Sequence, residues 1–167
     1  MTPQIQLISL DRSFLNDEYI SWLNDPSVTR FLEVRHQLQN FSTITEYYEQ
    51  IKGNPQNIWR AIVHRDNEQH IGNIKCTLSR YGVGEMSLFI GNKNYRRRGV
   101  GTEAVRLMSD IAFGAGAVKL VAFIYSSNYA SQRTFSKCEY TLEAVLHNEV
   151  IDMGKRADLL RFVKYPC

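Results

Sequence analysis

Apolar residues recur along the chain with two spacings, and each spacing predicts a different kind of element. Alternating or nearly continuous apolar runs predict strands. The run at residues 118–125 is apolar almost throughout, as in a strand buried on both faces. The predicted strands cover residues 4–9, 58–64, 70–78, 84–90 and 118–125, with two more around Gly154 within residues 140–165.

Apolar residues spaced three and four apart predict the helices. One such stretch covers residues 13–24, and Pro26 then begins a short helix over residues 26–32. Thr43 and Glu46 have the spacing of a capping box at the start of a third helix, which Gly53 ends. Two further helices are predicted from Val100 to about Gly114 and from Asn128 to Lys137.

The order of these elements predicts an α+β fold. A strand is followed by two or three helices, three strands, a helix, a strand, a helix and two strands. This order combines hairpins with crossovers, so we expect a mixed central sheet of about seven strands. No repeat, low-complexity segment or linker divides the 167 residues. A single domain over residues 1–167 is therefore expected.

Composition narrows the class of protein. The chain is 44% hydrophobic and 22% charged, as in ordinary globular proteins. No apolar run is long enough for a membrane span, and Met1 does not begin a signal peptide, so we expect a cytoplasmic protein without a membrane partner. Cys76, Cys138 and Cys167 lie far apart, and the histidines lack metal-ligand spacing. Neither a disulfide framework nor a metal site is predicted.

The segment from Tyr95 to Ala104 carries the clearest functional signal. It joins the strand at residues 84–90 to the helix that begins at Val100. Its two glycines allow close approach of the backbone, and the first N–H groups of a helix favour an anion. Three consecutive arginines add charge-assisted hydrogen bonds. We therefore expect this segment to bind a phosphate or pyrophosphate.

Two common phosphate motifs do not account for this segment. Residues 99–104 fit the dinucleotide pattern GxGxxA, but Gly91 to Arg98 separates these glycines from the strand, and no acidic residue ends the next strand. A Walker A loop is excluded because no Gly-Lys-Ser/Thr is present. The net charge of +3 suits an anionic ligand, whereas a nucleic-acid site calls for a larger basic face.

Two blocks of the chain resemble the GNAT superfamily of acetyl-CoA-dependent N-acetyltransferases. Residues 96–101, Arg-Arg-Arg-Gly-Val-Gly, match its R/Q-x-x-G-x-G/A signature, and residues 128–137 are similar to its N-x-x-S-x-x-x-[YF]-x-K helix. Residues 19–26 and 84–91 are similar to the ribosomal-protein N-terminal acetyltransferase-like branch. The resemblance implies a mostly antiparallel sheet that splays beside an acetyl-CoA site, and transfer of an acetyl group to a primary amine.

The resemblance also implies which residues contact acetyl-CoA. The N–H groups of Phe89 and Ile90 are oxyanion candidates. Asn128 would bind a pantetheine amide, and Arg133 or Lys137 would reach a phosphate. The implied contact residues are Phe89, Ile90, Arg96, Arg97, Arg98, Gly99, Val100, Gly101, Thr102, Asn128, Arg133 and Lys137.

Two residues are candidates for proton transfer. Glu85 shares one side of its strand with Ser87 and Phe89 and is the candidate base, the alternative being a solvated strand-end glutamate. The family's usual tyrosine is replaced by Phe135, so Ser131 is the candidate that assists the leaving thiolate. The alternative for this serine is a hydrogen bond to its own helix.

One further position departs from the family pattern. Glu139 stands where the family has glycine, and glutamate is disfavoured at positive φ. The turn that follows the last predicted helix is therefore expected to form less easily than in the family.

The acceptor and the oligomeric state are left open. A protein N-terminus and a small amine such as a nucleotide amino sugar are both compatible with the chain. Glu33 or Asp152 could hold a cationic amine and Arg35 a phosphate, although such residues are more often surface charges. Without the tyrosine, a catalytically inactive coenzyme A-binding or regulatory module is the alternative function. Nucleic-acid binding is not expected, and both a monomer and a homodimer are compatible.

Overall fold

Residues 3–166 are described by the computed structural model, and within them seven strands form one mixed sheet in the order β1-β2-β3-β4-β5-β7-β6. Every neighbouring pair is antiparallel except β4 and β5, which are parallel. The predicted mixed, mostly antiparallel sheet is confirmed. The strands are β1 (Ile5–Ser9), β2 (Asn57–His64), β3 (His70–Leu78), β4 (Val83–Ile90), β5 (Lys119–Tyr125), β6 (Thr141–Asp152) and β7 (Lys155–Lys164).

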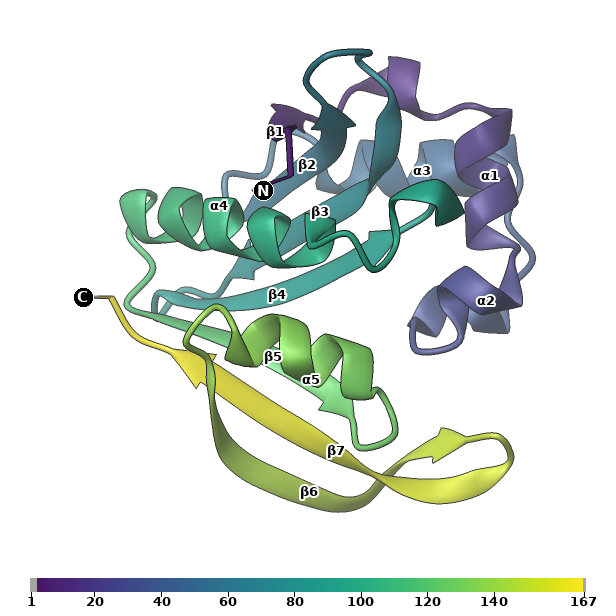
Figure 1. Ribbon diagram of the computed structural model, residues 1–167. Coiled ribbons are helices and arrows are strands. Elements are labelled where there is room, and N and C mark those ends of the chain that lie inside the picture. Colours follow the sequence, from purple (N-terminus) through teal and green to yellow (C-terminus); the bar gives the residue numbers. More distant parts are fainter. Residues whose placement is uncertain (1–2, 167) are drawn as a thin grey trace.

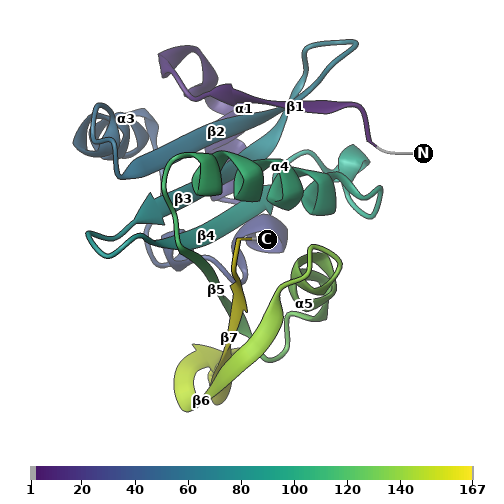
Figure 2. The same cartoon turned by 90° about the vertical axis from the view of Figure 1, so that its left-hand side faces the viewer.

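Helices cover both faces of the sheet (Figure 1). One face carries α4 and α5 over the larger core, and the other carries α1 and α3 over a smaller core, while α2 contacts β4. Figure 2 shows α4 and α5 together on one side, with α3 on the opposite side. The helices are α1 (Asp17–Leu23), α2 (Pro26–Thr29), α3 (Phe41–Ile51), α4 (Val100–Gly114) and α5 (Tyr129–Ser136).

The two N-terminal helices are shorter than the sequence predicts. The stretch at residues 13–24 divides into a 3-10 turn (Arg12–Phe14) and α1, because the Asn16 side chain accepts a hydrogen bond from the N–H of Tyr19 and caps a new helix. The second helix is also shorter than predicted, since α2 ends at Thr29.

The capping box of α3 is likewise shifted by three residues. Asn40 and Thr43 form it, in place of the predicted pair of Thr43 and Glu46. The Asn40 side chain accepts from the N–H of Thr43, and the hydroxyl of Thr43 accepts from the N–H of Asn40. Asparagine is as good an N-cap as serine or threonine, so the helix starts at Phe41.

The parallel pair β4–β5 separates along its length. Only Val83–Glu85 of β4 pairs with β5, opposite Lys119–Val121. β4 nevertheless continues to Ile90, while β5 continues beside β7. The sheet is therefore splayed after Glu85, which confirms the predicted splay and leaves one edge of the β4 backbone without a neighbouring strand.

Candidate active site

The turn before α4 leaves backbone N–H groups without helical partners. Gly99 is the N-cap with φ of +77°, and no side chain caps the helix. The first helical hydrogen bond runs from the N–H of Glu103 to the C=O of Gly99 (3.0 Å). The N–H groups of Val100, Gly101 and Thr102 precede it and are free of helical bonds. This is the arrangement that binds anions at helix N-termini.

The three arginines of this turn have different environments. Arg97 has φ of +59°, a left-handed conformation that costs a non-glycine residue about 1–2 kcal/mol. Together with Gly99 it curves the backbone into a concave run of amides, and both Arg97 and Arg98 are exposed. Arg96 instead turns inward, where its Nε donates to the C=O of Ile90 (3.1 Å) and Nη1 to the Ser27 hydroxyl (3.4 Å).

The register of β4 decides which backbone donors face the splayed opening. The N–H of Gly91 donates to the C=O of Ile71, a residue of β3 (2.9 Å). Because backbone groups alternate along a strand, the N–H of Phe89 also faces β3, whereas those of Leu88 and Ile90 face the side that β5 has left. Of the two predicted oxyanion donors, only Ile90 therefore lies on the open side. The N–H of Leu88 also lies on the open side but was not predicted, since the sequence carries no signal for the pairing register.

α5 follows β5, the strand that borders the splayed opening opposite β4. Asn128 caps this helix, and its Oδ1 accepts from the N–H of Ser131 (3.1 Å). Among the described residues, none hydrogen-bonds with the Ser131 hydroxyl, whereas the Ser109 hydroxyl bonds to its own helix at Val105 (2.7 Å). Phe135 is buried in the main core. Ser131 therefore retains a hydroxyl that is free for a ligand.

The two basic residues predicted on α5 are both exposed to solvent. Arg133 lies in the last turn of the helix, and Lys137 is its C-cap. Neither side chain forms an ion pair within residues 3–166. Their roles toward a phosphate stay predictions.

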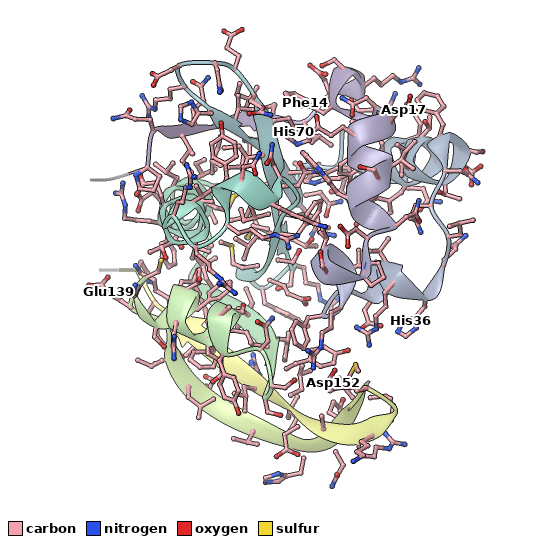
Figure 3. The ribbon with its side chains drawn as sticks, turned by 45° about the vertical axis from the view of Figure 1, so that its right-hand side comes forward. Phe14, Asp17, His36, His70, Glu139 and Asp152 are labelled. Carbon is pink, nitrogen blue, oxygen red and sulfur yellow. The ribbon has the colours of Figure 1, made fainter. Side chains whose placement is uncertain are left out.

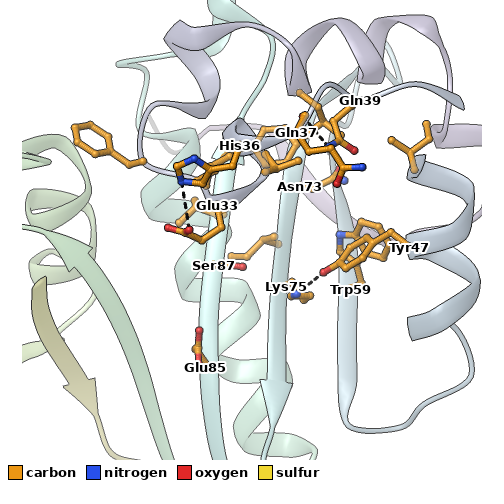
Figure 4. Close-up of a pocket in the computed structure, with 18 of the residues that line it drawn as sticks. Glu33, His36, Gln37, Gln39, Tyr47, Trp59, Asn73, Lys75, Glu85 and Ser87 are labelled. Carbon is orange, nitrogen blue, oxygen red and sulfur yellow. Dashed lines mark hydrogen bonds and ion pairs between the residues drawn. The ribbon is translucent and has the colours of Figure 1, made fainter. Parts of the chain in front are cut away.

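A cavity of about 1030 Å³ opens on the face of the sheet that carries α1 and α3 (Figure 4). Residues of both β4 and β5 line it, so it extends into the splayed opening. Glu85 and Ser87 of β4 face it, as the predicted alternation of the strand requires, and the Glu85 carboxylate is exposed. Its ionisable lining residues are Glu33, His36, Glu46, Lys75 and Glu85.

A polar cluster joins the segment after α2 to β5. The Tyr125 hydroxyl donates to Glu33 Oε1 (3.1 Å) and accepts from Arg35 Nη2 (2.9 Å). Arg35 also donates to the C=O of Ile151 (3.3 Å). Tyr125 was missed at the sequence level, since it reads as one more buried strand residue.

Asp152 occupies the end of β6, across from this segment (Figure 3). Its carboxylate accepts from the Ser127 hydroxyl (2.5 Å) and pairs with Arg30 (3.1 Å). These two partners hold the pKa of Asp152 below its usual value. Both carboxylates thus have partners within the chain, but the side chain of Glu33 remains 79% exposed at the cavity.

In residues 3–166, no group of three His, Cys, Asp or Glu side chains gathers as a metal site, and no helix has the length and apolarity to cross a membrane. Cys76 and Cys138 are buried free thiols, and burial raises the pKa of both, that of Cys76 to about 12. Cys167 lies outside the described residues.

Comparison with known families identifies the class of protein. Residues 10–141 match the model of the Acetyltransferase (GNAT) domain. The chain therefore belongs to the GNAT family of acetyltransferases, enzymes that take their acetyl group from acetyl-CoA. No curated protein sequence matches the chain. The ribosomal-protein branch stays a prediction.

Solved structures share this fold at low sequence identity. The spermidine N-acetyltransferase from Vibrio cholerae, in complex with CoA and spermine, has a TM-score of 0.87 and 16% identity over 97% of this chain and 95% of its own. The microcin C7 self-immunity acetyltransferase MccE, in complex with acetyl-CoA and AMP, has a TM-score of 0.81 and 18% identity over 98% and 93%. A putative phosphinothricin N-acetyltransferase has a TM-score of 0.77 and 19% identity over 96% and 98%. These likenesses concern the fold.

Proposed function

We propose that this enzyme acetylates a primary amine by direct attack of the amine on the thioester of acetyl-CoA. The observation that carries the proposal is that two openings meet at β4. The N–H groups of Leu88 and Ile90 are open on the splayed side, and the cavity lined by Glu85 extends into the same splay. A thioester and an amine that enter from opposite faces would therefore meet at this strand.

The backbone turn before α4 is proposed to supply much of the binding energy for acetyl-CoA. The free N–H groups of Val100, Gly101 and Thr102, with the exposed charges of Arg97 and Arg98, suit a pyrophosphate. Asn128, Arg133 and Lys137 lie at or near α5 and are proposed to contact the rest of the molecule. Binding at fixed backbone positions would orient the thioester before reaction.

The proposed chemistry assigns one role to each group at β4. The amine loses a proton to the Glu85 carboxylate, directly or through water, and its nitrogen bonds to the thioester carbon. The N–H of Ile90 stabilises the resulting oxyanion. The C–S bond then breaks, the Ser131 hydroxyl hydrogen-bonds to the departing thiolate, and the proton held by Glu85 passes through water to that thiolate. An amide and coenzyme A result.

The first experiment measures thiol release from acetyl-CoA with polyamines, amino sugars, nucleotide amino sugars and N-terminal peptides, beside calorimetry with acetyl-CoA alone. Turnover with one class supports the proposal. Binding without turnover of any amine would favour the catalytically inactive module. Absence of acetyl-CoA binding would contradict the anion site at residues 96–102.

Replacing the candidate base tests the mechanism. Glu85→Gln should lower kcat about tenfold or more and leave acetyl-CoA affinity nearly unchanged, because only proton transfer is lost. Glu149→Gln, an exposed glutamate on β6, is the matched control and should keep the wild-type rate. An unchanged pH–rate profile in Glu85→Gln would contradict the assignment.

A further inference from the structure

The floor of the cavity contains a buried polar group without a partner. Asn73 on β3 is only 2% exposed and lines the cavity. Within residues 3–166 its Nδ2 has no hydrogen-bond partner. The Tyr19 hydroxyl lies near this side chain and burial raises the pKa of Tyr19, but no hydrogen bond of acceptable geometry joins them. A buried donor of this kind is costly unless a ligand or a water molecule pairs with it.

The orientation of the Asn73 amide follows from its neighbour His70. Nε2 of His70 lies 2.7 Å from Oδ1 of Asn73 and 3.1 Å from the C=O of Gly72. A backbone carbonyl only accepts, so Nε2 must carry the hydrogen and Asn73 must present its oxygen to the ring. The amide nitrogen is thereby left for the cavity.

The His70 ring is itself fixed by aromatic neighbours. Phe14 meets it edge-on and Trp22 lies against it, each with a ring-centre distance of 4.9 Å. Figure 3 shows His70 beside Phe14, next to α1. Burial lowers the pKa of His70, although the hydrogen bonds with Asn73 and Gly72 and the nearby carboxylate of Glu18 oppose this. His70 therefore acts as a positioning residue for Asn73.

A lysine adds positive charge to the same face of the strand. Lys75 lies two residues after Asn73, and its Nζ donates to the Tyr47 hydroxyl (2.7 Å) (Figure 4). None of the described carboxylates forms an ion pair with it. Glu46 also lines the cavity from α3, where the Ser42 hydroxyl donates to it (2.8 Å).

The cavity is consequently polar in two different ways. Glu33 and Glu85 face it beside the splay, and suit an amine that approaches the thioester. Asn73 and Lys75, on β3, present hydrogen-bond donors and a cation. Trp59 on β2 provides an apolar surface beside them.

We infer that Asn73 and Lys75 bind oxygen atoms of the acceptor, so that the substrate is a primary amine carrying hydroxyl, carbonyl or anionic oxygens rather than a linear polyamine. A polyamine offers only further ammonium groups, which Lys75 repels and Nδ2 of Asn73 cannot use. An oxygen-bearing amine satisfies both groups. The inference depends on the proposed function only for the acetylation of the bound amine.

The test compares acceptors and variants in the thiol-release assay. Glucosamine 6-phosphate, alanylalanine and spermine serve as probes, and an oxygen-bearing probe should exceed spermine in kcat/KM by about tenfold or more. Asn73→Leu and Lys75→Gln should each remove most of this preference while KM for acetyl-CoA is unchanged. Lys155→Gln, an exposed lysine at the start of β7, is the matched control. Higher kcat/KM for spermine in the wild type would overturn the inference.

Direct binding separates the inference from the proposed function. Calorimetry with glucosamine 6-phosphate and alanylalanine, on protein saturated with coenzyme A, should show binding of at least one probe that Lys75→Gln weakens about tenfold. This variant alters a half-buried side chain and keeps the inference testable if Asn73→Leu does not fold. Such binding without any turnover would overturn the proposed function alone. Absence of binding by both probes, or equal binding in wild type and Lys75→Gln, would overturn the inference, whereas turnover of spermine alone would leave the proposed function standing.

Discussion

Glu139 has a left-handed backbone conformation, with φ of +66°, in the turn between α5 and β6. This conformation costs an L-residue about 1–2 kcal/mol, whereas glycine adopts it freely. The carboxylate partly offsets the strain by pairing with Nζ of Lys164 (3.1 Å), which also donates to the C=O of Cys138. The positive φ expected from the family's glycine is therefore present here, at a residue that is poorly suited to it.

Replacing Glu139 separates the strain from the ion pair. Glu139→Gly should raise the free energy of unfolding by up to about 1 kcal/mol, because the strain released exceeds the added chain entropy and the lost exposed pair. Glu139→Ala keeps the strain and loses the pair, so it should lower that free energy by about 0.5 kcal/mol. Urea unfolding measures both, and a shift in the same direction for the two variants would contradict this account.

At the scale of the element, the beginning of α4 combines folding and binding in one turn. Gly99 requires a positive φ, and a Cβ there would lie 3.4 Å from Cγ of Pro3. Gly101 has ordinary helical geometry and room for a Cβ, with its nearest neighbour, Leu88, at 3.6 Å. Two glycines that look equivalent in the motif therefore have different structural requirements.

This difference predicts opposite effects of alanine at the two positions. Gly99→Ala should destabilise the fold by about 1–2 kcal/mol and weaken acetyl-CoA binding, because the turn must distort. Gly101→Ala should leave stability unchanged or raise it by about 0.5–1 kcal/mol, because alanine is the better helix former. Thermal unfolding and calorimetry with acetyl-CoA test the pair, and equal destabilisation would show that φ at Gly99 is not the cause.

At the scale of the molecule, residues 30–36 are tied to the β6–β7 hairpin at one side of the cavity. Arg30 pairs with Asp152, and Arg35 reaches Tyr125 and the C=O of Ile151. Because the Ser127 hydroxyl and Arg30 lower the pKa of Asp152, its ionised form contributes stability that is present above the ordinary pKa of 3.8 and is lost as pH falls through the lowered value.

Removing the charge of Asp152 should loosen this connection. We expect Asp152→Asn to speed amide hydrogen exchange in residues 30–36 and to raise KM for the acceptor more than it changes kcat, because one wall of the cavity becomes mobile. Hydrogen-exchange mass spectrometry and steady-state kinetics measure the two effects. Asp110→Asn, an exposed residue of α4, is the control. Unchanged exchange in both variants would show that the wall does not depend on Arg30 and Asp152.

The sequence by itself determined the features that depend on neighbouring residues. Strand and helix periods, the glycine turn of residues 96–101 and the helix that starts after Asn128 are local patterns, and the structure has elements at each of these places. Helix starts were less predictable, as at Asn16 and Asn40, because several nearby side chains can compete to cap a helix.

Only the tertiary structure decided which groups face the site. The free N–H groups at Leu88 and Ile90 follow from strand register, and the inward turn of Arg96 follows from its contacts with Ile90 and Ser27. The positions of Tyr125 and Asn73 on the cavity depend on segments far apart in the chain. Pairing register and packing between distant segments leave no local pattern in a sequence, and for that physical reason the direction in which these groups face could not be predicted from it.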